Sequence, residues 1–252
     1  MPPVTPFSLH GRRALVTGAG RGIGAAVAAA LAEAGAHVAL MARSADEIEA
    51  GAEAIRAKGG SAEAIPCDVT DLPAFRAALE RREPFHVFVG NAGTNRPAPF
   101  PEVTEADFDA VVGLNLRAAF FNAQAAAKRM IAGGVGGSIV TISSQMGHVG
   151  GARRSVYCAT KFAVEGMTKA MALDLAPHGV RANTVCPTFI ETPMTAPFLA
   201  DPAFKEQTLS KIPLGRLGRP EDVTGAVLFL ASDAASLVTG TSILVDGGWT
   251  AQ

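Results

Sequence analysis

Short apolar runs alternate with longer segments of helical character along the whole chain of 252 residues, and this alternation limits the possible folds most. Seven runs are rich in β-branched or aliphatic residues and are apolar almost throughout, as strands of a parallel sheet covered on both faces require. The predicted strands are residues 14–17, 38–41, 62–67, 85–89, 138–143, 181–186 and 242–245.

The segments between the predicted strands are long enough to form the crossover helices that parallel strands need. We expect helices over residues 22–34, 45–57, 73–82, 105–130 and 155–177, and a last helix that starts behind Pro220. This order predicts a single-domain, doubly wound (Rossmann) α/β fold with about seven parallel strands and helices on both faces. No linker or repeat interrupts residues 1–252, and the proline-rich stretch 187–213 is predicted to be the one long irregular segment.

The composition excludes several kinds of partner. Lys and Arg number 22 against 23 Asp and Glu, so the chain lacks the basic excess that binds nucleic acid, and no such partner is expected. No apolar run is long enough to span a bilayer and residues 1–13 do not resemble a signal peptide, so we expect a cytoplasmic protein without membrane association. Cys67, Cys158 and Cys186 form no CxxC and no Cys/His cluster, so neither a disulfide framework nor a metal site is expected.

A glycine-rich turn follows the first predicted strand directly. It reads Thr17-Gly18-Ala19-Gly20-Arg21-Gly22-Ile23-Gly24. Glycines let the backbone approach a pyrophosphate, and the N-terminus of the next helix offers N–H donors and the positive end of its dipole. The strand before the turn and the helix after it are the context that a dinucleotide-binding turn needs.

The T-G-x-x-x-G-I-G spacing of this turn resembles that of the short-chain dehydrogenase/reductase family, and the resemblance extends from Gly11 to Gly248. Further matching motifs are Asp68-Val69, Asn91-Ala92-Gly93, Asn115, Ser144 with Tyr157-x-x-x-Lys161, Pro187-x-x-Ile190-x-Thr192 and Asp246-Gly247-Gly248. The resemblance implies an NAD(P)-dependent oxidoreductase that transfers a hydride between nicotinamide and a carbonyl or secondary alcohol of a small molecule. The cofactor-binding residues that it implies are Gly18, Arg21, Gly22, Ile23, Gly24, Arg43, Asp68, Val69, Asn91, Ala92, Gly93, Tyr157, Lys161, Pro187, Ile190 and Thr192.

Tyr157 is the only tyrosine of the chain, and Lys161 follows four residues later in a predicted helix. Positions i and i+4 share a helix face, so the phenol and the ammonium are expected to be neighbours. A free phenol has a pKa of about 10, too high for acid–base catalysis near neutrality. The Lys161 cation, together with the positive charge of an oxidised nicotinamide, is expected to lower the pKa of Tyr157 toward the working range.

The resemblance also implies the roles of four catalytic residues. Tyr157 exchanges the proton with the substrate oxygen, and Ser144 holds that oxygen by a hydrogen bond. Lys161 contacts the nicotinamide ribose, and Asn115 holds a water that links Lys161 to solvent. Ser143 is a rival to Ser144, but the 13-residue interval to Tyr157 favours Ser144.

The end of the second predicted strand favours NADP(H) over NAD(H) as the cofactor. Relatives that prefer NAD have an acidic residue where this chain has Ala42, and Arg43 follows. An arginine there suits the 2′-phosphate of NADP, and Arg21 within the turn could add a second positive charge.

Three loops are expected to select the substrate, namely residues 94–100, 145–156 and 188–213. The last is apolar and is either a mobile lid or a packed loop without a gating role. Arg96, Arg153 and Arg154 could favour a polar or anionic substrate. Thr188 replaces the glycine of the family pattern, so the backbone there could run differently, because threonine resists positive φ. His86 replaces an aspartate and is expected to be a packed or solvated residue at a strand start.

Three functions remain open from the sequence. The first is a carbonyl, sugar or polyol dehydrogenase, and the second is a 3-oxoacyl-(acyl carrier protein) reductase. The second should present basic residues to an acidic carrier, yet residues 133–137 contain none and the helix ending near residue 177 is followed only by His178. The third, a catalytically silent dinucleotide sensor or scaffold, is disfavoured because all four catalytic residues are present. The two long predicted helices have apolar faces, and members of the family that the chain resembles commonly form tetramers through these helices. Both points suggest a homotetramer.

Overall fold

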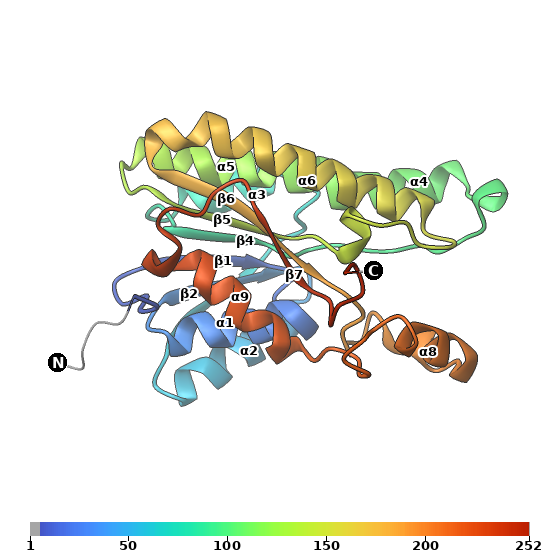
Figure 1. The fold of residues 1–252 in the computed structure, drawn as a ribbon. Coiled ribbons are helices and arrows are strands. Elements are labelled where there is room, and N and C mark those ends of the chain that lie inside the picture. Colours follow the sequence, from blue (N-terminus) through green and yellow to red (C-terminus); the bar gives the residue numbers. More distant parts are fainter. Residues whose placement is uncertain (1–5, 252) are drawn as a thin grey trace.

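Seven strands lie side by side in the order β3-β2-β1-β4-β5-β6-β7, and each is parallel to its neighbours. The computed structural model describes residues 6–251 (Figure 1). The strands are β1 (Arg13–Thr17), β2 (His37–Ala42), β3 (Ser61–Pro66), β4 (Val87–Gly90), β5 (Gly137–Ile142), β6 (Val180–Pro187) and β7 (Ser242–Val245). The doubly wound, seven-stranded parallel fold predicted from the sequence is confirmed.

Helices cover both faces of this sheet (Figure 1). One face carries α1 (Gly22–Glu33), α2 (Ala45–Ala57) and α9 (Pro220–Ala231). The other carries α3 (Leu72–Glu80), α4 (Glu105–Val112), α5 (Ala119–Ala132) and α6 (Ser155–Leu175). Among residues 6–251, no helix combines the length and the apolar character needed to cross a membrane.

The sheet separates two apolar cores, one under each layer of helices. Along β1, Ala14 and Val16 face the core of α1, α2 and α9, whereas Leu15 faces the core of α3, α5 and α6. In the second core the rings of Phe75 and Phe88 pack edge to face with centroids 6.3 Å apart. Because side chains on both faces of a strand are buried, the strands are apolar throughout and do not alternate.

Most predicted boundaries lie within two residues of the observed ones. β4 begins at Val87, two residues after the predicted start at Phe85. His86, directly before it, is bonded twice to Arg13: its backbone N–H donates to the Arg13 carbonyl oxygen at 2.8 Å, and its Nδ1 atom accepts from the Arg13 N–H at 3.1 Å. His86 therefore ties the beginnings of β1 and β4 together, as a packed strand-start residue should.

The helix predicted over residues 105–130 is interrupted. Between α4 and α5 the chain forms a π-helical segment, Gly113–Ala118, which contains Asn115. Such wide turns insert one extra residue into a helix and occur frequently at functional sites. The interruption brings the Asn115 side chain toward the sheet and leaves the helix otherwise continuous.

The prediction that residues 187–213 are irregular was wrong. They contain two short helices, α7 (Ala196–Leu199) and α8 (Pro202–Leu209), which lie past the end of the sheet in Figure 1. The Asp201 carboxylate accepts a hydrogen bond from the N–H of Ala203 at 3.0 Å, so Asp201 and Pro202 form a helix start that the sequence already contained.

Candidate active site

The carboxyl ends of the central strands bring the predicted motifs to one edge of the sheet. The glycine turn follows β1, Asn91-Ala92-Gly93 follows β4, Ser144 follows β5, and Thr188 follows β6. Parallel strands end at the same edge, where ligands of open α/β sheets bind. The residues singled out by sequence therefore meet although they are far apart in the chain.

Three positions of the turn accept only glycine. Gly18 and Gly22 have φ values of 63° and 59°, which side chains rarely adopt. A Cβ on Gly18 would lie 2.9 Å from Nδ2 of Asn91, and one on Gly22 would lie 3.2 Å from Cγ2 of Thr192. At Gly24 a Cβ would overlap the carbonyl oxygen of Gly18. The turn is therefore packed against the loops after β4 and β6.

Asn91 and Thr17 hold the turn in place. The Nδ2 group of Asn91 donates to the carbonyl oxygens of Thr17 and Gly18 at 2.9 and 3.1 Å. The Thr17 hydroxyl oxygen accepts from the backbone N–H groups of Asn91 and Ala92 at 3.0 and 3.2 Å. The Asn91 side chain thus fixes the backbone of the glycine turn.

The first turn of α1 offers an anion site. No side chain caps the helix, and its first turn contains no acidic residue. Its N–H groups and the positive end of its dipole therefore remain available for a pyrophosphate. Ile23 packs against the apolar core and anchors this turn.

The end of β2 carries positive charge at the surface. Arg43 follows Ala42 and is exposed. Two hydrogen bonds from Thr70, at 2.9 and 2.7 Å, lower the pKa of Asp68, and the charge of Arg43 lowers it further. Arg21 is paired loosely with Glu47, with 3.8 Å between nitrogen and oxygen.

The neighbouring Val69 is fixed by its backbone. Its carbonyl oxygen accepts a hydrogen bond from Nδ2 of the buried Asn122 at 3.1 Å. At the end of β6 and in the loop after it, Pro187 and Ile190 are buried, and Ile190 forms a bridge with Gly218. Thr192 is partly buried, and its N–H donates to the Thr195 hydroxyl at 3.0 Å.

The replacement of glycine by Thr188 is accommodated without strain. Arg153 is the only non-glycine residue with positive φ in the described part of the chain, so Thr188 does not adopt the left-handed conformation. Its N–H donates to the carbonyl oxygen of Val245 at 3.2 Å and prolongs the pairing of β6 with β7.

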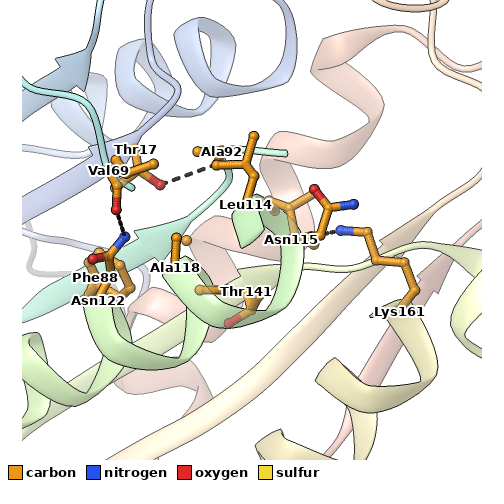
Figure 2. A pocket seen from close by; sticks show the side chains of 13 residues that line it. Thr17, Val69, Phe88, Ala92, Leu114, Asn115, Ala118, Asn122, Thr141 and Lys161 are labelled. Carbon is orange, nitrogen blue, oxygen red and sulfur yellow. Dashed lines mark hydrogen bonds between the residues drawn. The ribbon is translucent and has the colours of Figure 1, made fainter. Parts of the chain in front are cut away.

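Asn115, Ser144, Tyr157 and Lys161 come together beside the turn (Figure 2 shows Asn115 and Lys161). The Asn115 amide is buried and is bonded in both directions to the backbone of Thr94, at 2.8 Å each. The Lys161 ammonium donates to the carbonyl oxygen of Ile142 at 2.8 Å and lies 5.5 Å from the centre of the Tyr157 ring.

A small cavity lies between Asn115 and Lys161. Apolar side chains such as Phe88 and Leu114 make up most of its lining, Thr141 and Asn122 add polar atoms, and its volume is about 20 Å³ (Figure 2). A cavity of this size has room for about one water molecule.

The two central groups have shifted pKa values in opposite directions. Burial raises the pKa of the Tyr157 phenol to about 12, although a hydrogen bond with Ser144 and the charge of Arg154 oppose this shift. Burial lowers the pKa of Lys161 to about 8. The sequence led us to expect a lowered pKa for Tyr157. Within the protein itself, burial outweighs the nearby cations, so the neutral phenol is favoured.

Ser144 and Ser143 differ in their surroundings. The Ser144 hydroxyl donates to Oε1 of Gln145 at 2.7 Å and accepts from the N–H of Met146 at 3.1 Å, and it also acts on the Tyr157 phenol by lowering its pKa. Ser143 is buried against Gly147 and Cys186. The geometry therefore places Ser144 beside the phenol. Gln145 was missed in the sequence, because nothing marks it as the buried partner of this hydroxyl.

The three arginines suggested for substrate binding are in different environments. Arg96 is exposed and forms an ion pair with Asp107 at 2.8 Å. Arg153 is also exposed, with φ of 60°. Arg154, in contrast, is only 6% exposed and lies at the start of α6. Of the three, only Arg154 is buried.

One cluster of side chains, separate from the four predicted catalytic residues, combines possible metal ligands. His148, Glu165 and Cys186 bring their ligand atoms within 4.8 Å of one another. The Glu165 carboxylate, however, already accepts hydrogen bonds from the hydroxyls of Thr184 and Ser242. Burial raises the pKa of Cys186 to about 12, which keeps its thiol protonated. The cluster is a buried hydrogen-bond network that joins α6 to β6 and β7.

Comparison with known proteins gives consistent matches over nearly the full length. Residues 18–250 match the family model described as enoyl-(acyl carrier protein) reductase. L-xylulose reductase of Bos taurus is 41% identical, over 96% of this chain and 98% of the relative. Gluconate 5-dehydrogenase of Gluconobacter oxydans is also 41% identical, over 97% and 96%. The crystal structure of a gluconate 5-dehydrogenase from Burkholderia cenocepacia, in complex with NADP and tartrate, superposes with a TM-score of 0.95 at 37% identity, covering 99% of both chains.

Proposed function

The chain belongs to the short-chain dehydrogenase/reductase family, and from this premise we propose that it interconverts ketoses or keto sugar acids with the corresponding alcohols, preferring NADP(H). Members of the family are NAD(P)-dependent oxidoreductases acting on CH–OH groups, and this chain is one of them. The single observation that carries the proposal is the meeting of Tyr157, Ser144 and Lys161 beside the glycine turn.

The residues present fit a nicotinamide dinucleotide. The turn leaves its backbone open where Cβ atoms at Gly18 and Gly22 would intrude, and the uncapped start of α1 supplies donors for the pyrophosphate. Bound there, the dinucleotide supplies or accepts the hydride. Lys161 would hold the nicotinamide ribose, while Asp68 and Val69 would lie along the adenine.

Tyr157 is the proposed acid–base catalyst. In reduction its phenol protonates the carbonyl oxygen of the substrate, and a neutral phenol is the form that the raised pKa favours. In oxidation the phenolate removes the proton from the alcohol. Ser144 holds the same oxygen by a hydrogen bond, which requires its hydroxyl to turn from Gln145 toward the substrate.

Lys161 and Asn115 complete the proton path. The Lys161 ammonium lies near the Tyr157 ring and next to the small cavity that Asn115 lines. A water molecule in that cavity would connect the ammonium to solvent and replace the proton that Tyr157 gives up. The buried Asn115, bonded to Thr94, holds this wall of the cavity in place.

Three observations support NADP(H) over NAD(H). β2 ends in Ala42, which cannot bind ribose hydroxyls as an acidic residue would, and the exposed Arg43 follows. The gluconate 5-dehydrogenase from Burkholderia cenocepacia was solved with NADP. Asp68 does not neutralise Arg43 by a close ion pair within the described residues, so the guanidinium can turn toward a phosphate.

The relatives support a polyhydroxylated substrate, because L-xylulose is a ketose and gluconate is a sugar acid.

We further propose a cytoplasmic homotetramer, and the exposed apolar side chains of α5 and α6 support the assembly. The reduction of acyl thioesters is the competing activity, and it is measured in the same assay.

The test is NADPH oxidation with ketoses, keto sugar acids and acetoacetyl-CoA, comparing the natural chain with Tyr157→Phe. We expect reduction of at least one ketose or keto acid, lowered roughly 100-fold or more in Tyr157→Phe, since a general acid contributes about that factor. NADPH binding, followed by its fluorescence, should stay unchanged. Turnover of the thioester alone, or unchanged turnover in Tyr157→Phe, would contradict the proposal.

A further inference from the structure

Arg154 is a buried cation without an anionic partner. Its side chain is 6% exposed, and none of the ion pairs formed among residues 6–251 includes it. Its one hydrogen bond within the described residues runs from Nη1 to the carbonyl oxygen of Arg153 at a long 3.4 Å. Within the same residues, the Nε and Nη2 atoms have no protein acceptor and are not fully enclosed, so the edge of the guanidinium stays open to a ligand.

This arrangement is unusual for a side chain that is so little exposed. A buried charge costs several kcal/mol in lost hydration unless it is paired and hydrogen-bonded. The half-buried Arg181 shows the usual solution, because its guanidinium donates to the carbonyl oxygens of Leu230, Ser232 and Val238. Arg154 has no such set of acceptors. Its pKa is lowered, and burial is the largest cause.

The position of Arg154 relates it to the reacting centre. It is the residue directly before α6 and precedes Tyr157 by three residues, so both residues lie at the same end of this helix. Its charge lowers the pKa of Tyr157. A substrate held by Tyr157 would therefore lie at the end of α6 that carries these donors.

The segment 188–213 covers the same guanidinium. The Cζ atom of Arg154 lies 5.1 Å from the centre of the Phe198 ring on α7. Phe198 packs on Phe204 of α8, and Phe204 packs on Phe189, with centroids 6.5 and 5.6 Å apart. The aromatic ring stabilises the cation on one face and excludes water from it. The edge of the guanidinium, where its donors lie, is not used by this contact.

We propose that Arg154 binds the carboxylate of the substrate, so that the enzyme selects sugar acids over neutral sugars and polyols. The planar guanidinium matches a carboxylate with two parallel hydrogen bonds, and its burial strengthens that pairing. This inference rests on the proposed function and names the substrate class within it. It also assigns a role to the segment 188–213, which holds the guanidinium through Phe198.

The exposed Arg153 provides the matched control. It carries the same charge one residue earlier, but its side chain lies in solvent. A general attraction of anions to positive charge would depend on both residues, whereas direct binding of a carboxylate depends on Arg154 alone.

The experiment uses pairs of probes that differ only in one terminal group: gluconate with sorbitol, mannonate with mannitol, and galactonate with galactitol. Binding is measured by calorimetry at saturating NADP⁺, in the Tyr157→Phe background so that no turnover interferes. We expect the acid of at least one pair to bind about 30-fold more tightly than its polyol, and Arg154→Gln to remove this preference. Arg153→Gln should keep it, and Arg154→Lys should restore part of it. Thermal melting checks that each variant is folded.

Each outcome separates this inference from the proposed function. If no acid binds more tightly than its polyol, or if Arg154→Gln weakens both members of a pair equally, the carboxylate site is wrong. Oxidation of sorbitol or mannitol by the unmodified enzyme would then still support the proposed function. If the acids bind through Arg154 but neither acid nor polyol is oxidised, the carboxylate site stands and the proposed reaction fails.

Discussion

Burial shifts the pKa values of Tyr157 and Lys161 in opposite directions. Burial disfavours whichever form is charged, so it raises the pKa of the phenol to about 12 and lowers that of the ammonium to about 8. The phenol is consequently neutral throughout the physiological range, whereas Lys161 loses its charge only slightly above that range. The Ser144 hydrogen bond and the Arg154 charge both act against burial at Tyr157.

The lowered pKa of Lys161 predicts a limit on reduction at alkaline pH. The ammonium is fully present below pH 7 and is lost as the pH rises through about 8. Because the cation holds the ribose and feeds the proton path, kcat/KM for carbonyl reduction should be constant below pH 7 and should fall above about pH 8. A profile from pH 6 to 10 at saturating NADPH measures this. A profile that stays flat through pH 9.5 would remove Lys161 from the proton path.

Cofactor choice is also decided by single residues. Replacing Arg43 by Asp converts the end of β2 to the acidic type that binds ribose hydroxyls and repels a 2′-phosphate. We expect the ratio of kcat/KM for NADPH over NADH to fall by at least about tenfold, the effect of losing one charge-assisted contact. Arg21→Asp is the comparison: Arg21 is already paired with Glu47, so its loss should change the ratio less. A natural preference for NADH that Arg43→Asp leaves unchanged would contradict the assignment.

At the scale of elements, the glycine turn joins β1, β4 and the loop after β6 into one unit. Gly24→Ala places a methyl group against the Gly18 carbonyl and Nδ2 of Asn91, which are backbone and a fixed side chain. We expect it to lower the free energy of unfolding by about 1–3 kcal/mol, as overpacking does, and to weaken NADPH binding. Gly225→Ala in α9 is the matched control, because no atom lies within 4 Å of its Cβ position. Equal melting temperatures for the two variants would contradict this packing.

The elements that the sequence predicts well are those with a strong local pattern. Continuous apolar strands, the glycine turn and the Tyr157–Lys161 spacing each follow from residues next to one another, and the structure places them as expected. The π-helical turn at Asn115 has no local pattern, because it results from packing against α6 and the loop of Thr94. Likewise, Arg153 and Arg154 are neighbouring arginines, and no sequence pattern shows which of the two is buried. Only the packing of Phe198 on one of them distinguishes an exposed arginine from a buried one.

At the scale of the whole molecule, one layer of helices leaves apolar side chains in solvent. Phe108 on α4, Phe120 on α5, and Phe162 and Leu173 on α6 are 42–78% exposed. All four belong to the helices that cover one face of the sheet, shown in the upper part of Figure 1. Single exposed apolar side chains are common on protein surfaces, but several on neighbouring helices are typical of a surface that binds another protein. A second copy of this chain would cover the same surface symmetrically.

Light scattering tests this assembly directly. We expect a mass of about 103 kDa, four times the 25.8 kDa of the chain, at micromolar concentration. Phe162→Glu together with Leu173→Glu should shift the mass toward smaller species, because two buried carboxylates would lack partners at the interface. Phe7→Glu is the control: Phe7 is 46% exposed but packs on Phe229 of α9, in the other layer of helices, so the mass should not change. A monomeric mass for the unmodified chain would show that these helices do not form the interface, and their exposed side chains would then need another partner.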